Sequence, residues 1–416
     1  MIKFLHFADV HLGVENYGHY QAQTGLHTRF VDFIRCLEAS IDIALEEKVD
    51  FALFCGDAYK NNNPSPTYQR EFAHQIYRLS DARIPTVLVN GNHDHSISFG
   101  RASALDIFRT LNIPYTYVFS DPGLLTLETN QGPIQVLAIP WPTRNQYLDK
   151  KEYRDNDNDS INKMIQKRLK KYILKESNKI NSQLPAILAG HFTVAEALFS
   201  GSENYALIGH DPVIPKHFFF HLPYDYIALG HIHRHQDLNA KNSPPIVYSG
   251  SIERINFGEE KEDKGICLGS IDTKKHVDYE FISLPARKMI TIEVKISQAE
   301  NPTTQFIKII EKYDLEGAIV RVVYEISEKI EHQLDFQKIN HSLENAFLVT
   351  GITRNLNKKA HVKRSVLSEK MNLISALETY IRINQLTPWA DDLKKNAIHL
   401  QQAQMKKDST GEGGKI

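Results

Sequence analysis

The N-terminal two-thirds of the chain alternate short apolar runs with amphipathic segments, and this alternation restricts the fold more than any other feature. The runs over 2–8, 51–55 and 86–89 are apolar and have the length of buried strands. Between them, apolar residues recur at helical spacing over 30–45, and a second helix is predicted over 67–79. This strand–helix–strand–helix–strand order predicts parallel neighbouring strands with functional groups on loops at their carboxyl ends.

The strands predicted further along the chain are shorter and more hairpin-like. They cover 124–127, 134–139, 187–189, 226–229 and 246–248. Taken with the first three strands, they favour a mixed sheet, or two stacked sheets flanked by helices, over a single doubly wound sheet. The predicted fold class is therefore α/β with mixed strand directions.

Five short polar motifs directly follow predicted strands. They are Asp9-Val10-His11, Gly56-Asp57, Gly91-Asn92-His93-Asp94, Gly190-His191 and Gly230-His231-Ile232-His233. Their carboxylate, amide and imidazole groups, without a thiolate, suit manganese or iron better than structural zinc. A pair of such cations most often serves phosphoester hydrolysis, so the motifs predict a two-metal hydrolase.

The spacing of the motifs divides seven candidate ligands between two cations. The first would be held by Asp9, His11, Asp57 and His233, and the second by Asp57, Asn92, His191 and His231. A carboxylate that gives one oxygen to each cation, as predicted for Asp57, keeps the pair roughly 3.5–4 Å apart. The side chain of His93 is left as the candidate acid for the leaving oxygen, with Asp94 holding its ring.

The remaining histidines are interpreted without a metal. The chain contains 19 histidines, so several must be structural. Those predicted to be structural are His6, His19, His27, His74 and His217.

Charge and cysteine usage limit the classes of partner and compartment. The formal net charge is only −1, so affinity for a polyanion must come from local patches or from the cations. Cys36, Cys55 and Cys267 are far apart and form no CxxC pair, which indicates a reducing compartment. No apolar run approaches the ~20 residues of a membrane helix, and we expect a cytoplasmic protein.

A lysine-rich segment over 163–179 leaves two interpretations open. Its apolar residues, Ile161, Ile165, Leu169, Tyr172 and Ile173, fall on one side of a helix. The opposite side is either a solvated basic surface or a surface that contacts phosphate backbones.

The character of the sequence changes after Leu284. Clean alternation over 290–296 and 318–324, with a helix predicted over 304–313, indicates a small α+β unit. From about Arg364 the sequence is helical and amphipathic. The predicted domains are 1–284, 285–356 (the small unit), 357–406 (helices that need a partner or pack on themselves) and 407–416 (a disordered tail).

The order DxH, GD, GNHD, GH and GHxH resembles that of the calcineurin-like metallophosphoesterase superfamily. More narrowly, the string from Phe7 to Gly13 and the string from Tyr248 to Glu259 resemble the SbcD nuclease family. The resemblance covers the first ~285 residues well and the remainder only by layout. It implies a metallophosphoesterase β-sandwich flanked by helices, a small capping domain that contacts DNA, and C-terminal helices.

The resemblance also implies an activity and partners. Members of this family are two-metal, usually Mn²⁺-dependent nucleases of DNA repair and recombination. They degrade double strands from the 3′ end and cut single strands and hairpins. They work as homodimers with an SMC-like coiled-coil ATPase, SbcC, to which the helices after Arg364 would dock, and a nucleoid-associated location follows.

Two parts of the resemblance leave questions open. Many relatives carry a second histidine in a GDxxH string, whereas Lys60 occupies that position here, so the acid role falls on His93. Glu253 and Arg254 fit the family string, but the sequence assigns them no role beyond ordering a loop.

Two other functions are alternatives to a DNA nuclease. They are a phosphodiesterase or phosphatase for small nucleotides, and a scaffold without catalytic activity.

Overall fold

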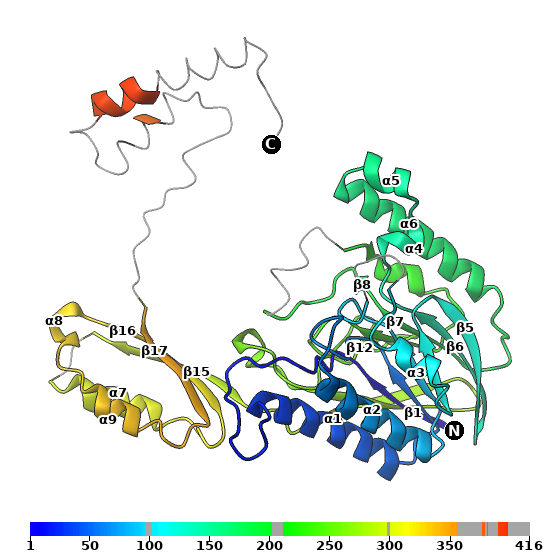
Figure 1. Ribbon diagram of the computed structural model, residues 1–416, viewed down its shortest axis with the longest axis horizontal. Coiled ribbons are helices and arrows are strands. Elements are labelled where there is room, and N and C mark those ends of the chain that lie inside the picture. Colours follow the sequence, from blue (N-terminus) through cyan, green and yellow to red (C-terminus); the bar gives the residue numbers. More distant parts are fainter. Residues whose placement is uncertain are drawn as a thin grey trace. The chain divides into compact units, whose positions relative to one another are not determined.

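The computed structural model describes most of the chain and divides it into two compact units, 1–353 and 354–416 (Figure 1). The described residues are 1–95, 101–201, 211–297, 300–355, 377–378, 381 and 390–397; the side chains of 150, 151 and 153 are not described.

The first of two large sheets has six strands in the order β14-β13-β1-β2-β3-β4. Their bounds are β1 (Ile2–Phe7), β2 (Phe51–Phe54), β3 (Thr86–Val89), β4 (Thr116–Phe119), β13 (Gly265–Ile271) and β14 (Val277–Ser283). Strands β1 to β4 pair in parallel, as the strand–helix alternation predicts, and β13 and β14 pair antiparallel at one edge.

The second large sheet also has six strands, in the order β11-β12-β10-β7-β6-β5. Their bounds are β5 (Gly123–Thr129), β6 (Gly132–Ile139), β7 (Ala186–His191), β10 (Tyr226–Gly230), β11 (Gln236–Asp237) and β12 (Ile246–Tyr248). The expectation that these strands are hairpin-like is confirmed for β5 and β6, which pair antiparallel across a short turn, and β12 pairs antiparallel with β11. It is wrong for β7 and β10, which pair only in parallel, with β6, with each other and with β12. The chain between these strands is long enough for the crossovers that parallel pairing requires.

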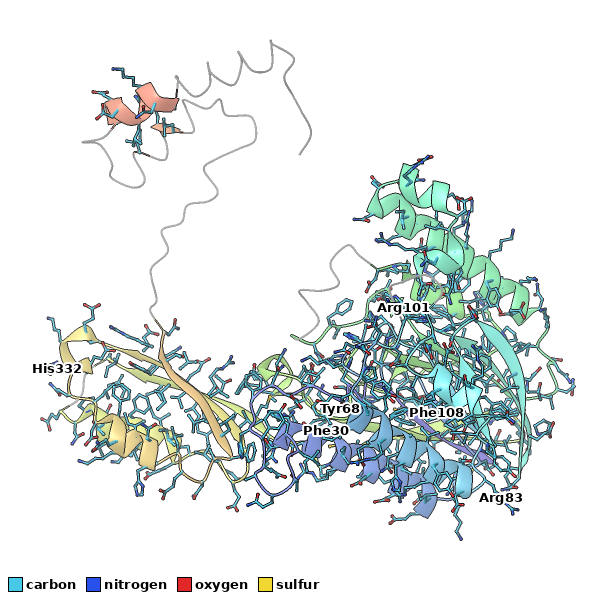
Figure 2. All side chains as sticks on the ribbon, in the orientation of Figure 1. Phe30, Tyr68, Arg83, Arg101, Phe108 and His332 are labelled. Atoms are coloured by element: carbon cyan, nitrogen blue, oxygen red, sulfur yellow. The ribbon has the colours of Figure 1, made fainter. Side chains whose placement is uncertain are left out.

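The two sheets stack face to face, and helices cover their outer faces (Figure 1). Inner-face residues such as Phe4, Leu53 and Tyr226 share one core between the sheets. Helices α1 (Thr28–Glu46) and α2 (Pro66–Asp81) pack on the first sheet, where the rings of Phe30 and Tyr68 meet with centroids 4.8 Å apart (Figure 2). This arrangement confirms the predicted sandwich of stacked sheets flanked by helices.

Helix α6 (Asn158–Ser177) covers the second sheet and confirms the predicted amphipathic helix. Its buried apolar residues are Ile161, Ile165, Leu169 and Ile173. The shorter elements of this part are α3 (Asp106–Thr110), α4 (Arg144–Tyr147), α5 (Lys150–Asp155), β8 (Thr193–Val194), β9 (Val213–Ile214), and the 3₁₀ turns η1 (Lys216–Phe219) and η2 (Phe257–Glu259).

The predicted small α+β unit is present and has its own core. Its elements are β15 (Met289–Ile296), α7 (Pro302–Ile310), β16 (Ile319–Ile326), α8 (Glu328–Glu331), α9 (Phe336–His341) and β17 (Leu348–Arg354). Strands β15 and β16 pair in parallel around the crossover helix α7. This helix starts two residues earlier than predicted because the Asn301 side chain caps it and Pro302 suits its first turn.

Most of the predicted C-terminal arm, 357–406, and all of the predicted tail, 407–416, lie outside the described residues. Within the arm, residues 390–397 are helical, as predicted, and Lys394 forms an ion pair of 2.7 Å with Glu378. Across the described part of the chain, no helix is both long enough and apolar enough to cross a membrane.

Candidate metal centre

The five polar motifs meet because the strands that carry them end at the same edge of the sandwich. Asp9, Asp57 and Asn92 follow the parallel strands β1, β2 and β3 of the first sheet. His191 ends β7 of the second sheet, and His231 follows the parallel strand β10. Two stacked sheets therefore bring seven side chains together from residues more than 200 positions apart in sequence.

The backbone is strained at four of the seven candidate ligands. Asp9, His11, Asp57 and His231 have φ angles of 54°, 48°, 62° and 93°. Residues other than glycine rarely adopt these left-handed conformations, which cluster at functional sites because the surroundings must enforce them. Here the Asp9 amide donates to the Gly56 carbonyl at 2.9 Å and the His11 amide to the Asp57 carbonyl at 3.0 Å.

The glycines of two motifs are required for the close approach of these loops. A Cβ atom on Gly91 would lie 2.0 Å from Oδ1 of Asp57, and one on Gly56 would lie 2.3 Å from Nδ1 of His191. Both motifs therefore need glycine in order to place their neighbours in the site.

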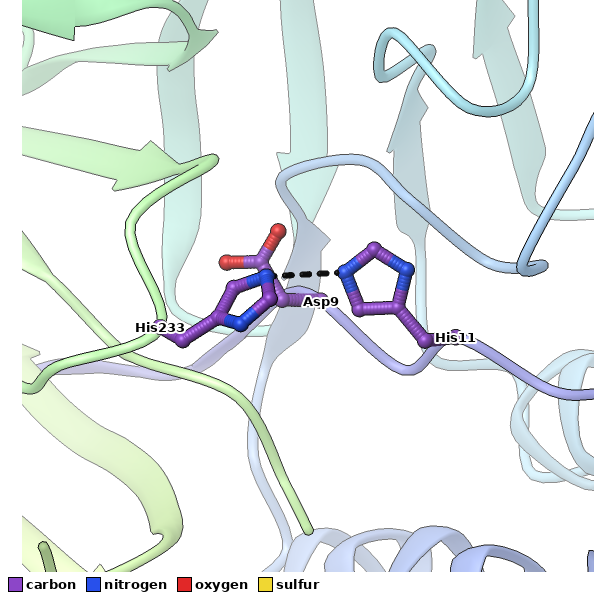
Figure 3. A group of neighbouring side chains, drawn as sticks. All are labelled: Asp9, His11 and His233. Carbon is purple, nitrogen blue, oxygen red and sulfur yellow. Dashed lines mark hydrogen bonds between the residues drawn. The ribbon is translucent and has the colours of Figure 1, made fainter. Parts of the chain in front are cut away.

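The first predicted ligand set converges (Figure 3). The Nε2 atoms of His11 and His233 lie 3.0 Å apart, and Asp9 completes a group whose ligand atoms lie within 4.8 Å of one another. Oδ2 of Asp57 lies 3.7 Å from Nε2 of His11, at the side of this group. The predicted first site is thus assembled from all four of its residues.

The second predicted ligand set also converges. Oδ1 of Asn92 lies 2.9 Å from Nε2 of His191 and 3.0 Å from Nδ1 of His231. Oδ2 of Asp57 lies 3.4 Å from Nε2 of His191, so the same oxygen faces both sets. This position fits the predicted shared ligand.

The separations between ligand atoms fit divalent cations. Neighbouring ligands of an octahedral ion with bonds of about 2.1 Å are about 3 Å apart. Several pairs, including His11 with His233 and Asn92 with His191, match that separation. The Nε2 atoms of His11 and His233 face one another at 3.0 Å, an arrangement that a shared cation stabilises, and we conclude that these residues fit the metal pair.

Burial shapes the charges of the site. Burial raises the pKa of Asp9 to about 7, although the His191 and His233 imidazoles act in the opposite direction. Burial would also raise the pKa of Asp57, but the imidazoles of His191 and His93 hold it well below its usual range. Burial lowers the pKa of His11 far below the usual value. The site is therefore a concentration of buried titratable groups, which is typical of functional centres.

Further contacts orient the imidazoles. Nδ1 of His191 donates to the Cys55 carbonyl at 2.6 Å, and Nδ1 of His233 lies 2.9 Å from Oε1 of Glu259. Each contact turns the opposite nitrogen, Nε2, toward the site. His231 presents Nδ1 instead, and its Nε2 lies 3.2 Å from Oδ2 of Asp211.

Sequence reasoning missed the roles of Glu259 and Asp211. Glu259 ends the string from Tyr248 that carries the family resemblance, so a signal was present. Asp211 belongs to no motif, and only the folded chain places it against His231.

The structure corrects the prediction that Asp94 holds the ring of His93. The Asp94 carboxylate is buried and accepts hydrogen bonds from the amides of Asp57 (2.9 Å), Ala58 (3.0 Å) and Gly91 (2.9 Å). These amides belong to the sharp turns after β2 and β3, and an ionised carboxylate can satisfy all three. Asp94 therefore supports the loops that carry the ligands.

A backbone carbonyl holds His93 instead. Nδ1 of His93 lies 2.7 Å from the carbonyl oxygen of Lys60, and Nε2 lies 3.9 Å from Oδ2 of Asp57. The His93 side chain is 43% exposed, whereas the Asp57 side chain is 2% exposed, so His93 stands at the open side of the site. Lys60, which stands where many relatives carry a second histidine, thus contributes its backbone carbonyl by holding the His93 ring.

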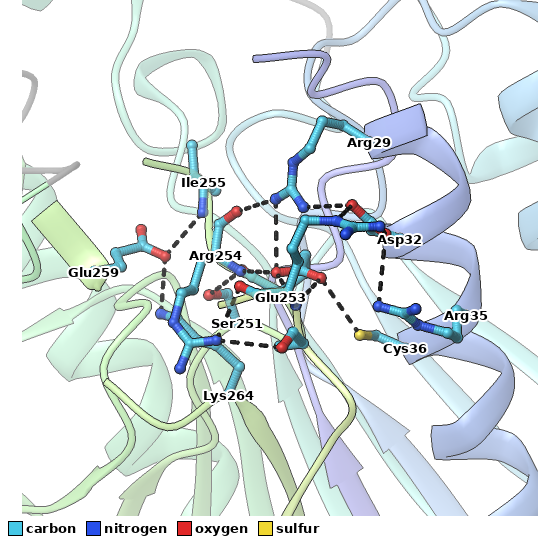
Figure 4. A network of polar contacts seen from close by, with 12 residues as sticks. Arg29, Asp32, Arg35, Cys36, Ser251, Glu253, Arg254, Ile255, Glu259 and Lys264 are labelled. Atoms are coloured by element: carbon cyan, nitrogen blue, oxygen red, sulfur yellow. Dashed lines mark hydrogen bonds and ion pairs between the residues drawn. The ribbon is translucent and has the colours of Figure 1, made fainter. Parts of the chain in front are cut away.

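Glu253 and Arg254 order a loop through their contacts (Figure 4). The Glu253 carboxylate is buried and accepts hydrogen bonds from the amides of Arg254 (2.7 Å) and Arg287 (2.9 Å). It also lies 3.6 Å from the guanidinium of Arg29 in α1. Arg254 donates to the carbonyls of Arg287 and Glu262. Together they tie the loop to α1 and to the start of the small unit.

This fold and site define a class of protein. Residues 2–235 match the calcineurin-like phosphoesterase family, and the chain belongs to that family. It is a metallophosphoesterase of mixed α/β fold, as the motif order predicts.

The chain is also similar to individual proteins from bacteria and archaea. The chain is 25% identical over 296 residues to a subunit of the nuclease SbcCD from Staphylococcus saprophyticus, covering 70% of this chain and 72% of that protein. It is 26% identical over 342 residues to the DNA double-strand break repair protein Mre11 of Archaeoglobus fulgidus, covering 77% and 67%. It is also 25% identical over 311 residues to YhaO, an uncharacterized metallophosphoesterase of Bacillus subtilis, covering 73% and 66%.

Proposed function

We propose that the protein is a DNA nuclease that uses two divalent cations, with Mn²⁺ the best candidate. The observation that carries this proposal is the convergence of two ligand sets on Oδ2 of Asp57, 3.7 Å from His11 and 3.4 Å from His191. A shared carboxylate oxygen is the usual bridge of a metal pair that hydrolyses phosphoesters. The first cation is assigned to Asp9, His11, Asp57 and His233, and the second to Asp57, Asn92, His191 and His231.

The chain's own groups supply the remaining chemistry. When bound, the cations would polarise the phosphate and lower the pKa of a water molecule toward neutrality. His93 protonates the leaving 3′-oxygen through Nε2, while its Nδ1–H donates to the Lys60 carbonyl at 2.7 Å. Its exposed position lets a long substrate reach it, whereas every assigned ligand except the partly exposed Asn92 is buried.

A polyanionic substrate is supported by the exposed side of α6. Lys167, Lys171 and Lys175 are exposed and recur every four residues, so they lie on one side of the helix. None of the three forms an ion pair with any part of the chain that the structure describes. The chain as a whole has a formal net charge of only −1, so this local cluster of lysines supplies the positive charge that binding to a polyanion requires. We assign it to contact with the DNA backbone.

The proposed assembly is a homodimer bound to an SbcC-type coiled-coil ATPase. Two relatives support the link to DNA breaks: one is named as a component of the nuclease SbcCD and the other as a double-strand break repair protein. The amphipathic sequence after Arg364 supports a docking arm. We assign 1–284 to the nuclease domain and 285–356 to a cap that contacts DNA.

Cleavage products test the proposed function. Purified protein with Mn²⁺ and a linear duplex labelled at either end is expected to release nucleotides from the 3′ end, and hairpin and single-stranded DNA are expected to be cut. Asp57→Asn is the matched control, because it keeps the size of the shared ligand but removes its charge. Hydrolysis of a chromogenic phosphodiester with no cleavage of any DNA would contradict the proposal and favour a small-nucleotide enzyme.

A further inference from the structure

The short turn η2 lies between the candidate metal centre and the small α+β unit. Its last residue, Glu259, contacts the predicted ligand His233, whereas its first residue, Phe257, belongs to a core with Met289 and Ile319 of the small unit. One turn of three residues therefore touches both parts of the molecule.

On the metal side, Glu259 and Lys264 form a buried ion pair (Figure 4), and this pair contacts His233 from two directions. Oε1 of Glu259 lies 2.9 Å from Nδ1 of the His233 ring. Oε2 of Glu259 accepts from the Ile255 amide at 3.1 Å and pairs with Nζ of Lys264 at 2.9 Å. The same Nζ donates to the His233 carbonyl at 3.0 Å. Both side chains of the pair are fully buried, so their positions determine where the His233 ring stands.

On the other side, Arg321 of β16 connects the small unit to η2 in two ways. Its guanidinium lies over the Phe257 ring, with Cζ 4.4 Å from the centroid. It also donates to Oγ1 of Thr291 at 2.9 Å, and this hydroxyl donates to Glu260 at 2.5 Å. Residues on both sides of Glu259 are thus fastened to β15 and β16, so a shift of these strands would move Glu259.

We propose that η2 couples the position of the small unit to the cation affinity of the first site, the one that contains His233. Glu259 is the positioning residue of this link, and Arg321 is its anchor in the small unit. A DNA strand or partner that displaces β15 and β16 would thereby loosen one metal site and leave the other intact. This inference rests on the proposed metal centre and adds a route by which it is regulated.

The link is tested without any nuclease assay by measuring the binding of Mn²⁺ alone to the full chain with isothermal titration calorimetry. Glu259→Gln/Lys264→Met removes both charges of the ion pair, while Glu262, the other partner of Lys264, keeps its hydrogen bond from Ser200. We expect one of the two sites to weaken about 10- to 100-fold. Arg321→Met acts from a distance, and we expect the same site to weaken about 2- to 30-fold. Combining the variants should weaken it by less than the product of the two factors.

Lys288→Met is the matched control, because the Lys288 ammonium pairs with Asp314 of the small unit at 2.7 Å, and no hydrogen bond or ion pair joins its side chain to η2 within the described part of the chain. The coupling is overturned if Arg321→Met leaves both Mn²⁺ affinities unchanged, or weakens both equally, while the wild type binds two ions. A wild-type chain that binds no Mn²⁺ would instead overturn the proposed function together with this inference. Thermal unfolding of each variant verifies that the fold is retained.

Discussion

His93 shows how a single side chain can be separated from its neighbours in function. Its ring stands at the open side of the site and is anchored by a main-chain carbonyl, whereas the candidate ligands other than Asn92 are buried. Because its assigned role is proton transfer, its loss should affect catalysis and leave metal binding unchanged.

We therefore expect His93→Gln to bind two Mn²⁺ ions with wild-type affinity and to cleave DNA about 10²- to 10⁴-fold more slowly. Calorimetry and initial rates on labelled duplex measure the two effects. His74→Gln, at an exposed position of α2, is the control and should retain full activity. Cleavage by His93→Gln at the wild-type rate would remove His93 from the acid role.

Asp94 illustrates the opposite case, a residue beside the site whose contacts are structural. Asparagine would replace one of its carboxylate oxygens with an NH₂ group that faces a backbone N–H. We expect Asp94→Asn to lower the free energy of unfolding by about 1–3 kcal/mol in urea titrations. The pH–rate profile should keep the shape of the wild-type profile. A stable variant with a displaced profile would restore the discarded pairing with His93.

At the scale of elements, α6 combines two requirements in one helix. Its buried side is mainly aliphatic and covers the second sheet, and its exposed side carries lysines. Packing on the sheet explains the buried side. The exposed side is either a solvated surface or a surface that binds phosphates, and only the second interpretation makes the DNA affinity depend on salt through these lysines.

For Lys167→Gln/Lys171→Gln/Lys175→Gln we expect weaker binding of duplex DNA and a shallower salt dependence. The slope of log Kd against log salt should decrease by about 1 for each lysine that contacts a phosphate. Fluorescence anisotropy over a series of KCl concentrations measures both. Lys48→Gln/Lys274→Gln/Lys275→Gln, in turns at the other end of the sheets, is the control with the same charge change. Equal slopes for the two triple variants would leave α6 as a solvated surface.

At the scale of the whole molecule, every candidate metal ligand lies within the unit 1–353. The amphipathic sequence after Arg364 contributes none of them, so the proposed docking and the proposed cleavage are separable.

Deleting the residues after Arg364 is therefore expected to preserve basal Mn²⁺-dependent cleavage and to abolish co-purification with the coiled-coil ATPase. Met371→Glu/Ile374→Glu, which places charge on the apolar stripe, should reproduce the loss of binding in the full-length chain. If the truncated protein still co-purified with the ATPase, the docking assignment would be wrong.

The order of elements and the identity of the candidate ligands could be predicted from the sequence, because both depend on local patterns. Apolar runs the length of a strand, each followed by a polar motif, predict where β1, β2, β3, β7 and β10 end. The parallel pairing of β6, β7, β10 and β12 could not be predicted, since short apolar strands fit hairpins and crossovers alike.

Only the tertiary structure decided which polar groups support the ligands. Asp94 binds the amides of loops that follow two different strands, and Asp211 and Glu259 reach histidines 20 and 26 positions away. Such contacts depend on how loops from two sheets face one another, which no local pattern records. The sequence by itself thus determined the donors and the chemistry they favour, and three-dimensional packing determined how those donors are held.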